Sequence, residues 1–295
     1  MELVAATKMR KSQEIALASR PYSFAALDLL ATLSSLNQEN PENIPELFKK
    51  REIKKVLFVL VSSDKGLAGA FNSAVFRKFE HHMRRDEAKY ANEEKIYLAV
   101  GEKSFNYLTK KGLNVIKKFV SVGDYTTTDQ IHPTVDFIVE GYLGKKWDRV
   151  VVVSTHFKSA LKQEPHVEKV LPVDFEHIKE IVSETIPEKG KFAELIKEQN
   201  VSFIPNKTDL KEYLVEPSAE KVLQKLSEHL FFIQFYHLVL EANASEHSAR
   251  RMAMKIASDN ASELGDALNL KYNKSRQARI TTEISEISAG AEALS

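Results

Sequence analysis

The chain contains no cysteine among its 295 residues, which excludes disulfides, cysteine-ligated zinc and thiol nucleophiles. A protein without cysteine has no need of an oxidising compartment. An excess of one charge is also lacking, because 42 Lys and Arg are balanced by 41 Asp and Glu, for a net charge of +1. A nucleic-acid-binding protein usually carries a basic excess on one face, so this balance argues against that class.

Long apolar runs are missing as well. No segment approaches the roughly 18 uninterrupted apolar residues that suggest a transmembrane helix. Residues 1–20 alternate apolar and charged side chains and contain no apolar core of a signal peptide. The sequence therefore predicts neither a membrane span nor a secretion signal.

Proline and glycine are scarce and unevenly placed. Most of the nine prolines and ten glycines lie between Pro41 and Pro217. From Ser218 to the end of the chain there is no proline, and the only glycines are Gly265 and Gly290. Because both residue types disfavour helix interiors, this distribution predicts helical ends around a globular middle.

Residues Met1–Leu36 are expected to form the first of these helices. Pro21 predicts a kink within it, and Pro41 and Pro45 predict its end. Apolar or small side chains recur at alternating spacings of three and four, which is the pattern of a helix that packs along another helix. These seam residues are Ile15, Ala18, Tyr22, Ala25, Leu29, Thr32 and Leu36.

Strand and helix signals alternate in the middle of the chain. Such alternation predicts a Rossmann-like α/β domain with a mostly parallel sheet and right-handed crossovers. The expected strands are Ile53–Ser62, Lys95–Val100, Asn114–Val120, Arg149–Thr155 and an edge strand at His166–Val173. The expected helices are Ser73–Arg85, Glu102–Lys111 and Thr128–Gly141. The polar, proline-broken segment Asp174–Glu216 is expected to be a connector, with one short helix at Phe192–Glu198.

The last segment, Glu216–Ser295, predicts one exceptionally long helix. Pro217 suits its first position, and Glu220 places an acid near the positive end of its dipole. An unbroken helix from Pro217 to the C-terminus would be about 118 Å long at 1.5 Å per residue. A small globular domain cannot cover such a rod. We therefore expect it to be covered by the first helix, which would pair with it antiparallel, or by other subunits. An apolar stripe at its end predicts contact with another protein, and consists of Ile280, Ile284, Ile287, Ala291 and Leu294.

These patterns divide the chain into four expected parts. Residues 1–52 are the N-terminal helix with its exit loop, and residues 53–173 are the α/β domain. Residues 174–216 are the connector, and residues 217–295 are the C-terminal helix. The expected fold is therefore α/β, with a long antiparallel pair of terminal helices forming a coiled coil.

Residues that could carry catalysis or bind a ligand have simpler structural interpretations. The turn Gly66–Gly69 follows a strand and precedes a helix, where a phosphate can bind, but it matches no nucleotide-binding motif. A tight turn is favoured over a nucleotide site. The pair His81-His82 has no metal-binding spacing, and nothing brings Asp64 and Asp148 together. The sequence predicts no catalytic residue, no cofactor and no metal.

Two polar runs, Lys8–Lys11 and Asn273–Arg279, would by themselves be solvated helix faces. Their flanking residues indicate more. Several segments resemble signatures of the gamma subunit of F-type ATP synthases, across both terminal helices and the first turn of the sheet. They are Met1–Lys11 (MELVAATKMRK), Asp64–Asn72 (DKGLAGAFN), Glu246–Asn260 (EHSARRMAMKIASDN), Tyr272–Gln277 (YNKSRQ), Ile280–Ile287 (ITTEISEI) and Ala289–Ala291 (AGA).

The resemblance implies a rotary shaft without catalysis of its own. In this family the paired helices stand inside a ring of alpha and beta subunits, and the globular part contacts the epsilon subunit and the membrane rotor ring of c subunits. Proton flow turns the ring and the shaft, and the shaft drives ATP synthesis at the alpha/beta interfaces. The implied location is peripheral, on the cytoplasmic face of a bacterial plasma membrane.

The resemblance also implies roles for individual residues. Members of the family begin roughly twenty residues upstream of Met1, which corresponds to about 30 Å of helix. Met1, Lys8 and Arg10 are expected on the shaft helix near beta. The residues expected to make polar contacts to beta are Arg276, Gln277, Thr281 and Glu283. The apolar tail expected to turn in the bearing at the top of the ring consists of Ile284, Ile287 and Leu294.

Two other hypotheses remain open at this point. A free-standing coiled-coil scaffold or adaptor would associate with itself through the exposed apolar tail. A nucleotide-dependent enzyme would bind its ligand at the Gly66–Gly69 turn. The shaft hypothesis differs from both because it requires a stable complex with alpha and beta subunits.

Overall fold

The part of the chain that the structure describes contains one sheet of five strands. The computed structural model describes residues 1–12, 14–15, 45–86, 92–122, 126–159, 161–173 and 216–293. The strand order is β3-β2-β1-β4-β5. Neighbouring strands are parallel except β4 and β5, which are antiparallel. The strands are β1 (Lys55–Val61), β2 (Glu94–Val100), β3 (Val115–Phe119), β4 (Arg149–Phe157) and β5 (Gln163–Leu171).

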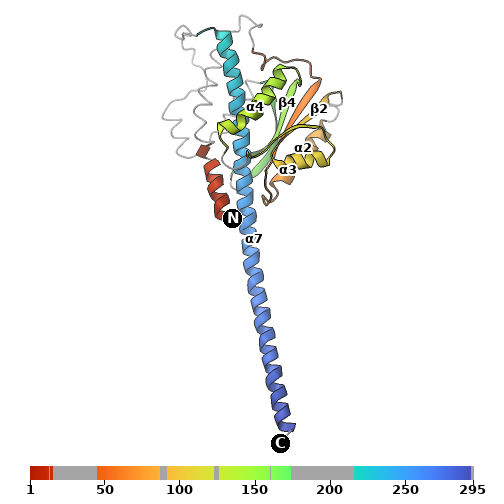
Figure 1. Ribbon diagram of the computed structural model, residues 1–295, viewed down its shortest axis with the longest axis vertical. Helices are drawn as coiled ribbons and strands as arrows, with labels where there is room; N and C mark the ends of the chain where they lie inside the picture. The colour runs from red at the N-terminus through yellow and green to blue at the C-terminus, as the bar shows by residue number, and fades with distance from the viewer. Residues whose placement is uncertain are drawn as a thin grey trace.

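Helices cover both faces of this sheet (Figure 1). Side chains of a strand alternate between the two faces, so Phe58 of β1 packs with α2 and α3, whereas Val59 packs with α4 and α7. The central strands are almost continuously apolar because both of their faces are buried. The helices are α2 (Phe71–Arg85), α3 (Glu102–Lys110), α4 (Thr128–Leu143) and α7 (Ala219–Ala293). The expected fold class, a mostly parallel α/β sheet with a long C-terminal helix, is confirmed.

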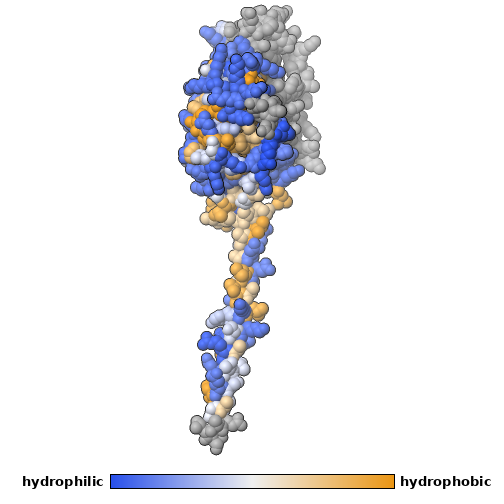
Figure 2. Space-filling model, turned by 90° about the vertical axis from the view of Figure 1, so that its right-hand side faces the viewer, coloured by the Kyte–Doolittle hydropathy of each residue, from blue (hydrophilic) through white to orange (hydrophobic). Residues whose placement is uncertain are grey.

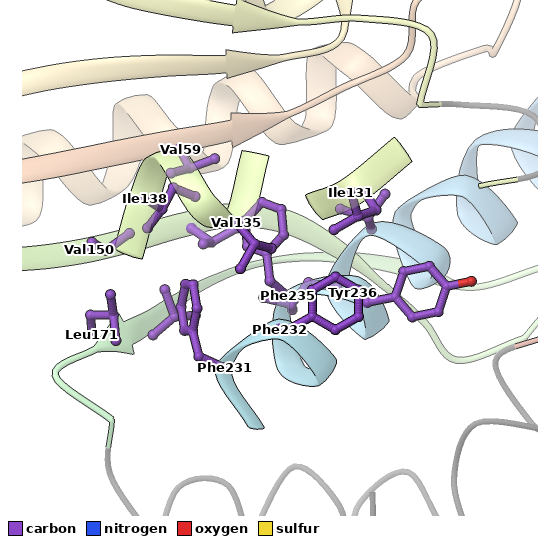
Figure 3. Packing of buried hydrophobic residues seen from close by; sticks show 14 of the residues in the cluster. Val59, Ile131, Val135, Ile138, Val150, Leu171, Phe231, Phe232, Phe235 and Tyr236 are labelled. Atoms are coloured by element: carbon purple, nitrogen blue, oxygen red, sulfur yellow. The ribbon is translucent and has the colours of Figure 1, made fainter. Parts of the chain in front are cut away.

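Helix α7 is 75 residues long, or about 112 Å at 1.5 Å per residue. Its first third belongs to the core of the globular part. Phe231 and Phe235 are fully buried, in the same cluster as Val135 and Ile138 of α4 (Figure 3). This burial anchors the helix in the domain before it leaves as a rod.

The beginning of α7 differs from the expectation. The helix starts at Ala219, and Pro217 lies before it rather than at its first position. Ser218 takes the role of N-cap: its carbonyl accepts a hydrogen bond from the Val222 N–H at 3.1 Å, and its hydroxyl accepts one from the Lys221 N–H at 3.4 Å. A serine cap satisfies the free N–H groups of the first turn, so the helix begins immediately after it.

The N-terminal segment is helical at residues 2–12 and lies beside α7, running in the opposite direction (Figure 1). Of the seam residues expected between the terminal helices, Ile15 packs against the core cluster. The other seam residues, the kink at Pro21, the connector helix at Phe192–Glu198 and the tail residue Leu294 lie outside the described residues. None of the described helices is both long enough and apolar enough to cross a membrane.

Candidate functional site

The longest exposed feature of the molecule is the part of α7 beyond the globular domain. From Arg251 to Ala293 it would measure about 64 Å at 1.5 Å per residue. It projects away from the sheet and from the described part of the N-terminal helix (Figure 1). Among the described residues this segment has neighbours only at its first turn, where Glu2 meets Arg251 and Gly69 lies beside Ala253, so most of it presents side chains on every side.

Large apolar side chains are spread along this exposed rod. Each is at least 47% exposed, and in Figure 2 they alternate with hydrophilic side chains down the helix. Full burial of one such side chain contributes roughly 1.5–3 kcal/mol. Exposed apolar surface of this extent marks an interaction surface. The residues are Ile256, Leu264, Leu268, Leu270, Tyr272, Ile280, Ile284 and Ile287.

The residues expected to contact beta lie near the tip of the rod. Arg276, Gln277, Thr281 and Glu283 are all exposed, and the Thr281 hydroxyl donates to the Gln277 carbonyl at 2.9 Å. With about 100° of rotation per residue, these four side chains fall within an arc of roughly 160°. The tail residues Ile284 and Ile287 fall within the same arc. One side of the tip therefore combines the predicted polar and apolar contacts.

The expected N-terminal contact residues lie elsewhere. Glu2 is 3.8 Å from Arg251, so Met1 begins where α7 leaves the domain, about 37 Å along the helix from Arg276. Arg10 is exposed and forms a 3.7 Å ion pair with Glu14, and Lys8 is half-buried. Ala5 and Ser12, seven residues apart, are the buried side chains of this helix. The structure does not bring the two predicted groups together.

The Lys65–Gly69 turn, which follows β1, is hydrogen-bonded to α7 near Met1. The Arg250 guanidinium pairs with Glu246 at 2.5 Å and donates to the carbonyl oxygens of Gly66 at 3.3 Å and Lys65 at 3.5 Å. A Cβ on Gly69, whose φ is +54°, would lie 3.6 Å from Ala253. The expected tight turn is present, but its close contact is with the long helix.

Exposed apolar side chains surround α7 at this level. Met1 is 83% exposed, Leu67 on the Lys65–Gly69 turn is 66% exposed, and Leu161 is 80% exposed. Leu161 belongs to the connection between β4 and β5, where the Gln163 amide lies 3.4 Å from the Ser248 hydroxyl of α7. We call Met1, Leu67 and Leu161 the collar. It adds a second exposed apolar surface at the base of the rod.

The carboxyl ends of the parallel strands, where α/β folds often bind phosphate, are occupied by the protein itself. The Asp64 carboxylate accepts hydrogen bonds from the N–H groups of Glu102 at 3.1 Å and Ser121 at 2.8 Å. The next N–H groups of α3 donate to the Ser63 carbonyl and to the Ser62 hydroxyl. A phosphate at the N-terminus of α3 would have to displace the Asp64 carboxylate.

Asp148, the other acid considered in the sequence, lies at the opposite end of the sheet. Its carboxylate accepts from the N–H groups of Lys54 and Lys55 at 3.0 and 3.1 Å and pairs with Arg51 at 3.0 Å. The two aspartates are thus separated by the length of β1. In the described part of the chain, no group of three or more His, Cys, Asp or Glu residues could hold a metal ion.

One titratable cluster lies where α4 crosses the start of α7. The His132 ring stacks on Phe232 at 4.3 Å, and His229 lies on the same ring at 6.2 Å. Burial, and then the nearby His132, lower the pKa of His229 below its ordinary value. Burial raises the pKa of Tyr236, whose hydroxyl donates to the Thr126 carbonyl at 2.9 Å. These groups join the two helices, and His229 also lines an open pocket of about 840 Å³ at the start of α7, together with Pro217, Lys221 and Lys225.

Comparison with known proteins gives this arrangement a family. A family model described as ATP synthase matches residues 1–294. The ATP synthase gamma chain of Polynucleobacter asymbioticus is 36% identical over 294 residues, covering 100% of this chain and 92% of the relative. That of Cytophaga hutchinsonii is 33% identical over 298 residues, with the same two coverages. The chain belongs to the ATP synthase gamma-chain family.

Solved structures share the fold of this gamma chain. A chain in the central stalk and c-ring structure of the Tetrahymena thermophila mitochondrial ATP synthase superposes with a TM-score of 0.58 at 21% identity. That alignment covers 88% of this chain and 97% of the other. A chain of the Euglena gracilis mitochondrial ATP synthase gives 0.53 at 18% identity, with 99% and 94% covered. This gamma chain therefore shares its fold, including the long C-terminal helix, with chains of these two ATP synthases.

The residues that attach the long helix to its domain could not be recognised in the sequence. Arg250 reaches a turn that is 184 positions away in the chain, and no periodicity signals such a contact. The only available signal was its place in the Glu246–Asn260 segment, which was read as a family signature. Asp64 entered the sequence analysis as one of two separate carboxylates and as the first residue of the Asp64–Asn72 signature, and neither indicates that it accepts hydrogen bonds from Glu102 and Ser121.

Proposed function

We propose that this gamma chain is the non-catalytic shaft of a proton-translocating F-type ATP synthase. In this proposal α7 turns inside a ring of alpha and beta subunits and couples rotation to ATP synthesis at their interfaces. One observation carries the proposal, the exposed apolar side chains along the rod from Ile256 to Ile287. Such a rod needs a surrounding protein to cover them, because burying apolar surface is the main gain in protein association.

The uneven distribution of residues at the tip supports a rotary role. The arc of roughly 160° that holds Arg276, Gln277, Thr281 and Glu283 also holds Ile284 and Ile287, so one side of the tip is more apolar than the other. Rotation would bring this arc to each beta subunit in turn. At any moment each beta subunit would then contact a different side of the tip. Such differing contacts would allow the beta subunits to change their nucleotide binding one after another.

The globular part supplies the base of the shaft and contributes no catalytic group in this proposal. The strand ends that could bind a phosphate are closed by Asp64. Catalysis is therefore assigned to the alpha/beta interfaces, without a cofactor or metal on this chain. The collar, formed by the exposed side chains of Met1, Leu67 and Leu161, is proposed to meet the lower edge of the ring. Lys8 and Arg10, further along the N-terminal helix, are proposed to lie near beta.

The other end of the globular part is assigned to the epsilon subunit and the membrane rotor ring. The Tetrahymena and Euglena structures are described as containing a c-ring, and the Euglena structure also contains F1. In this proposal the chain reaches the membrane only through that ring, on the cytoplasmic face of a bacterial plasma membrane. No nucleic acid takes part.

Reconstitution with alpha and beta subunits tests the proposal. We expect the purified chain to form a defined complex that hydrolyses ATP. A matched pair of variants adds specificity, since Ile284→Ser with Ile287→Ser should weaken assembly, whereas Lys271→Ser on the other side of the rod should not. Self-association of the chain, with no complex in the presence of alpha and beta, would instead favour the free-standing scaffold.

A further inference from the structure

A line of polar contacts joins the buried part of α7 to the hairpin of β4 and β5. The positions on α7 are spaced by four, three and seven residues, so they form one stripe along the helix. On the sheet side, Ser154 is directly opposite His166, and such opposite residues share a face. The contacts are Gln234 Nε2 to Glu168 Oε1 (2.7 Å), Ser154 Oγ to Leu238 O (3.2 Å), His156 Nδ1 to Glu241 Oε2 (2.5 Å) and Gln163 Nε2 to Ser248 Oγ (3.4 Å).

This line, which we call the polar seam, is buried at Glu168 and Gln234 and partly exposed at His156, Glu241 and Gln163. Glu168 is only 6% exposed and Gln234 only 8%. His166 lies 3.4 Å from the second oxygen of Glu168, so the carboxylate has partners on both sides. Burying a carboxylate is costly, and well-packed apolar residues in its place are often as stable or more so. The seam is therefore not explained by stability alone.

Directional contacts do provide a unique alignment of the helix. Apolar burial depends on area and has little preference for direction, whereas a hydrogen bond weakens steeply with distance and angle. A shift of α7 by one turn, in either direction, would place Leu230 or Leu238 where Gln234 now meets Glu168. The buried carboxylate would lose its amide partner, so the seam opposes this shift in addition to the close packing of Phe231 and Phe235.

We propose that the polar seam is a torque joint, in which Glu168, Gln234, His156 and Glu241 hold α7 at a fixed angle and height on the sheet. These are positioning residues and touch no substrate. The inference rests on the proposed shaft function, because a rotor driven at its globular base must pass rotation to its helix without slipping. One net hydrogen bond changes an equilibrium by roughly fivefold, so losing a pair should raise the misaligned population by about that factor.

A distance measurement on the isolated full-length chain tests the joint directly. The chain has no cysteine, so Lys78→Cys on α2 and Asp259→Cys on the rod introduce two unique spin-label sites, both exposed. Two seam variants replace both partners by apolar residues, Glu168→Leu with Gln234→Leu, and His156→Leu with Glu241→Leu. We expect the label-to-label distance distribution to broaden or split in either variant. The control Val239→Ala creates a buried cavity on α7 without touching the seam and should leave the distribution narrow.

The same variants in the complex with alpha, beta and the membrane sector then report on torque. We expect ATP hydrolysis to continue while protons pumped per ATP fall in the seam variants and not in Val239→Ala. A role in folding alone would lower the melting temperature and leave this ratio unchanged. Unchanged label distances in both seam variants overturn the joint, and so does an unchanged pumping ratio despite broadened distances. Failure of the wild-type chain to assemble contradicts the proposed function instead, and the label distances still decide whether the seam aligns the helix.

Discussion

Gly141 of α4 lies directly against the indole of Trp147, so closely that a Cβ on Gly141 would be 1.9 Å from Cζ2 of the ring. The indole is 2% exposed, and its Nε1–H donates to the Ile138 carbonyl at 3.1 Å. We expect Gly141→Ala to displace the ring and to lower the free energy of unfolding by about 1–3 kcal/mol, the usual cost of overpacking. Urea unfolding measures this loss. Trp147 is the only tryptophan of the chain, so its emission should also shift to the red.

Gly265→Ala is the matched control for that variant. Gly265 lies within α7, and a Cβ there would meet nothing within 4 Å. Replacing glycine by alanine in an open helix interior stabilises it by about 0.5–1 kcal/mol. Equal losses of stability in the two variants would contradict the assigned clash.

Arg250 and Arg251 are neighbours in α7 whose ion pairs differ in burial. Arg250 pairs with the buried Glu246 at 2.5 Å, whereas Arg251 and Glu2 are 3.8 Å apart and both partly exposed. We expect Arg250→Ala to cost roughly 1.5–3 kcal/mol of stability, since it removes hydrogen bonds to a charged group at a buried site. Arg251→Ala should cost about 0–1 kcal/mol, as exposed pairs do. Chemical denaturation of both variants compares them, and a reversed order would rule out the attachment of the Lys65–Gly69 turn by Arg250.

The sequence was sufficient for the elements whose signals are local. The apolar runs at β1 and β4 predict buried central strands, and the absence of proline after Ser218 predicts the length of α7. Each of these signals depends on residues close together in the chain. Helix boundaries were less certain, because at the start of α7 a serine cap and a proline compete for neighbouring positions.

The attachment of the helix to the domain could not be predicted in the same way. Glu168 and Gln234 are 66 positions apart, and each alone is a common surface residue. Their burial becomes apparent only when the helix lies on the hairpin of β4 and β5. The tip residues were found through a resemblance, because nothing local distinguishes Arg276 from other exposed arginines of a helix.

The lowered pKa of His229 predicts a pH dependence of stability. His229 is exposed on one side, and its partial burial by neighbouring side chains disfavours the charged imidazole, so the unfolded chain binds the proton more tightly than the folded chain. The contribution of His229 to the free energy of unfolding is therefore fully present above its ordinary pKa of 6.5 and is lost as the pH falls through the lowered pKa. We expect His229→Gln to reduce the loss of stability on acidification from neutral pH, as measured by urea unfolding at several pH values. His132→Asn should raise the pKa of His229 in an NMR titration, because it removes the second cause of the shift, and an unchanged titration would contradict that cause.

Arg276 and Gln277 lie on the side of the tip that also carries Ile284 and Ile287, whereas Lys271 lies on the opposite side by helical geometry. If the first side meets the beta subunits, Arg276→Ala with Gln277→Ala should remove polar contacts that form only at certain angles of rotation. We expect ATP-driven proton pumping to fall more than ATP hydrolysis in the assembled enzyme, while Lys271→Ala changes neither. Stability should be unaffected in both variants, since all three side chains are exposed. Unchanged pumping in the double variant would refute the contact, and an equal effect of Lys271→Ala would show that the charge of the tip matters and not its sidedness.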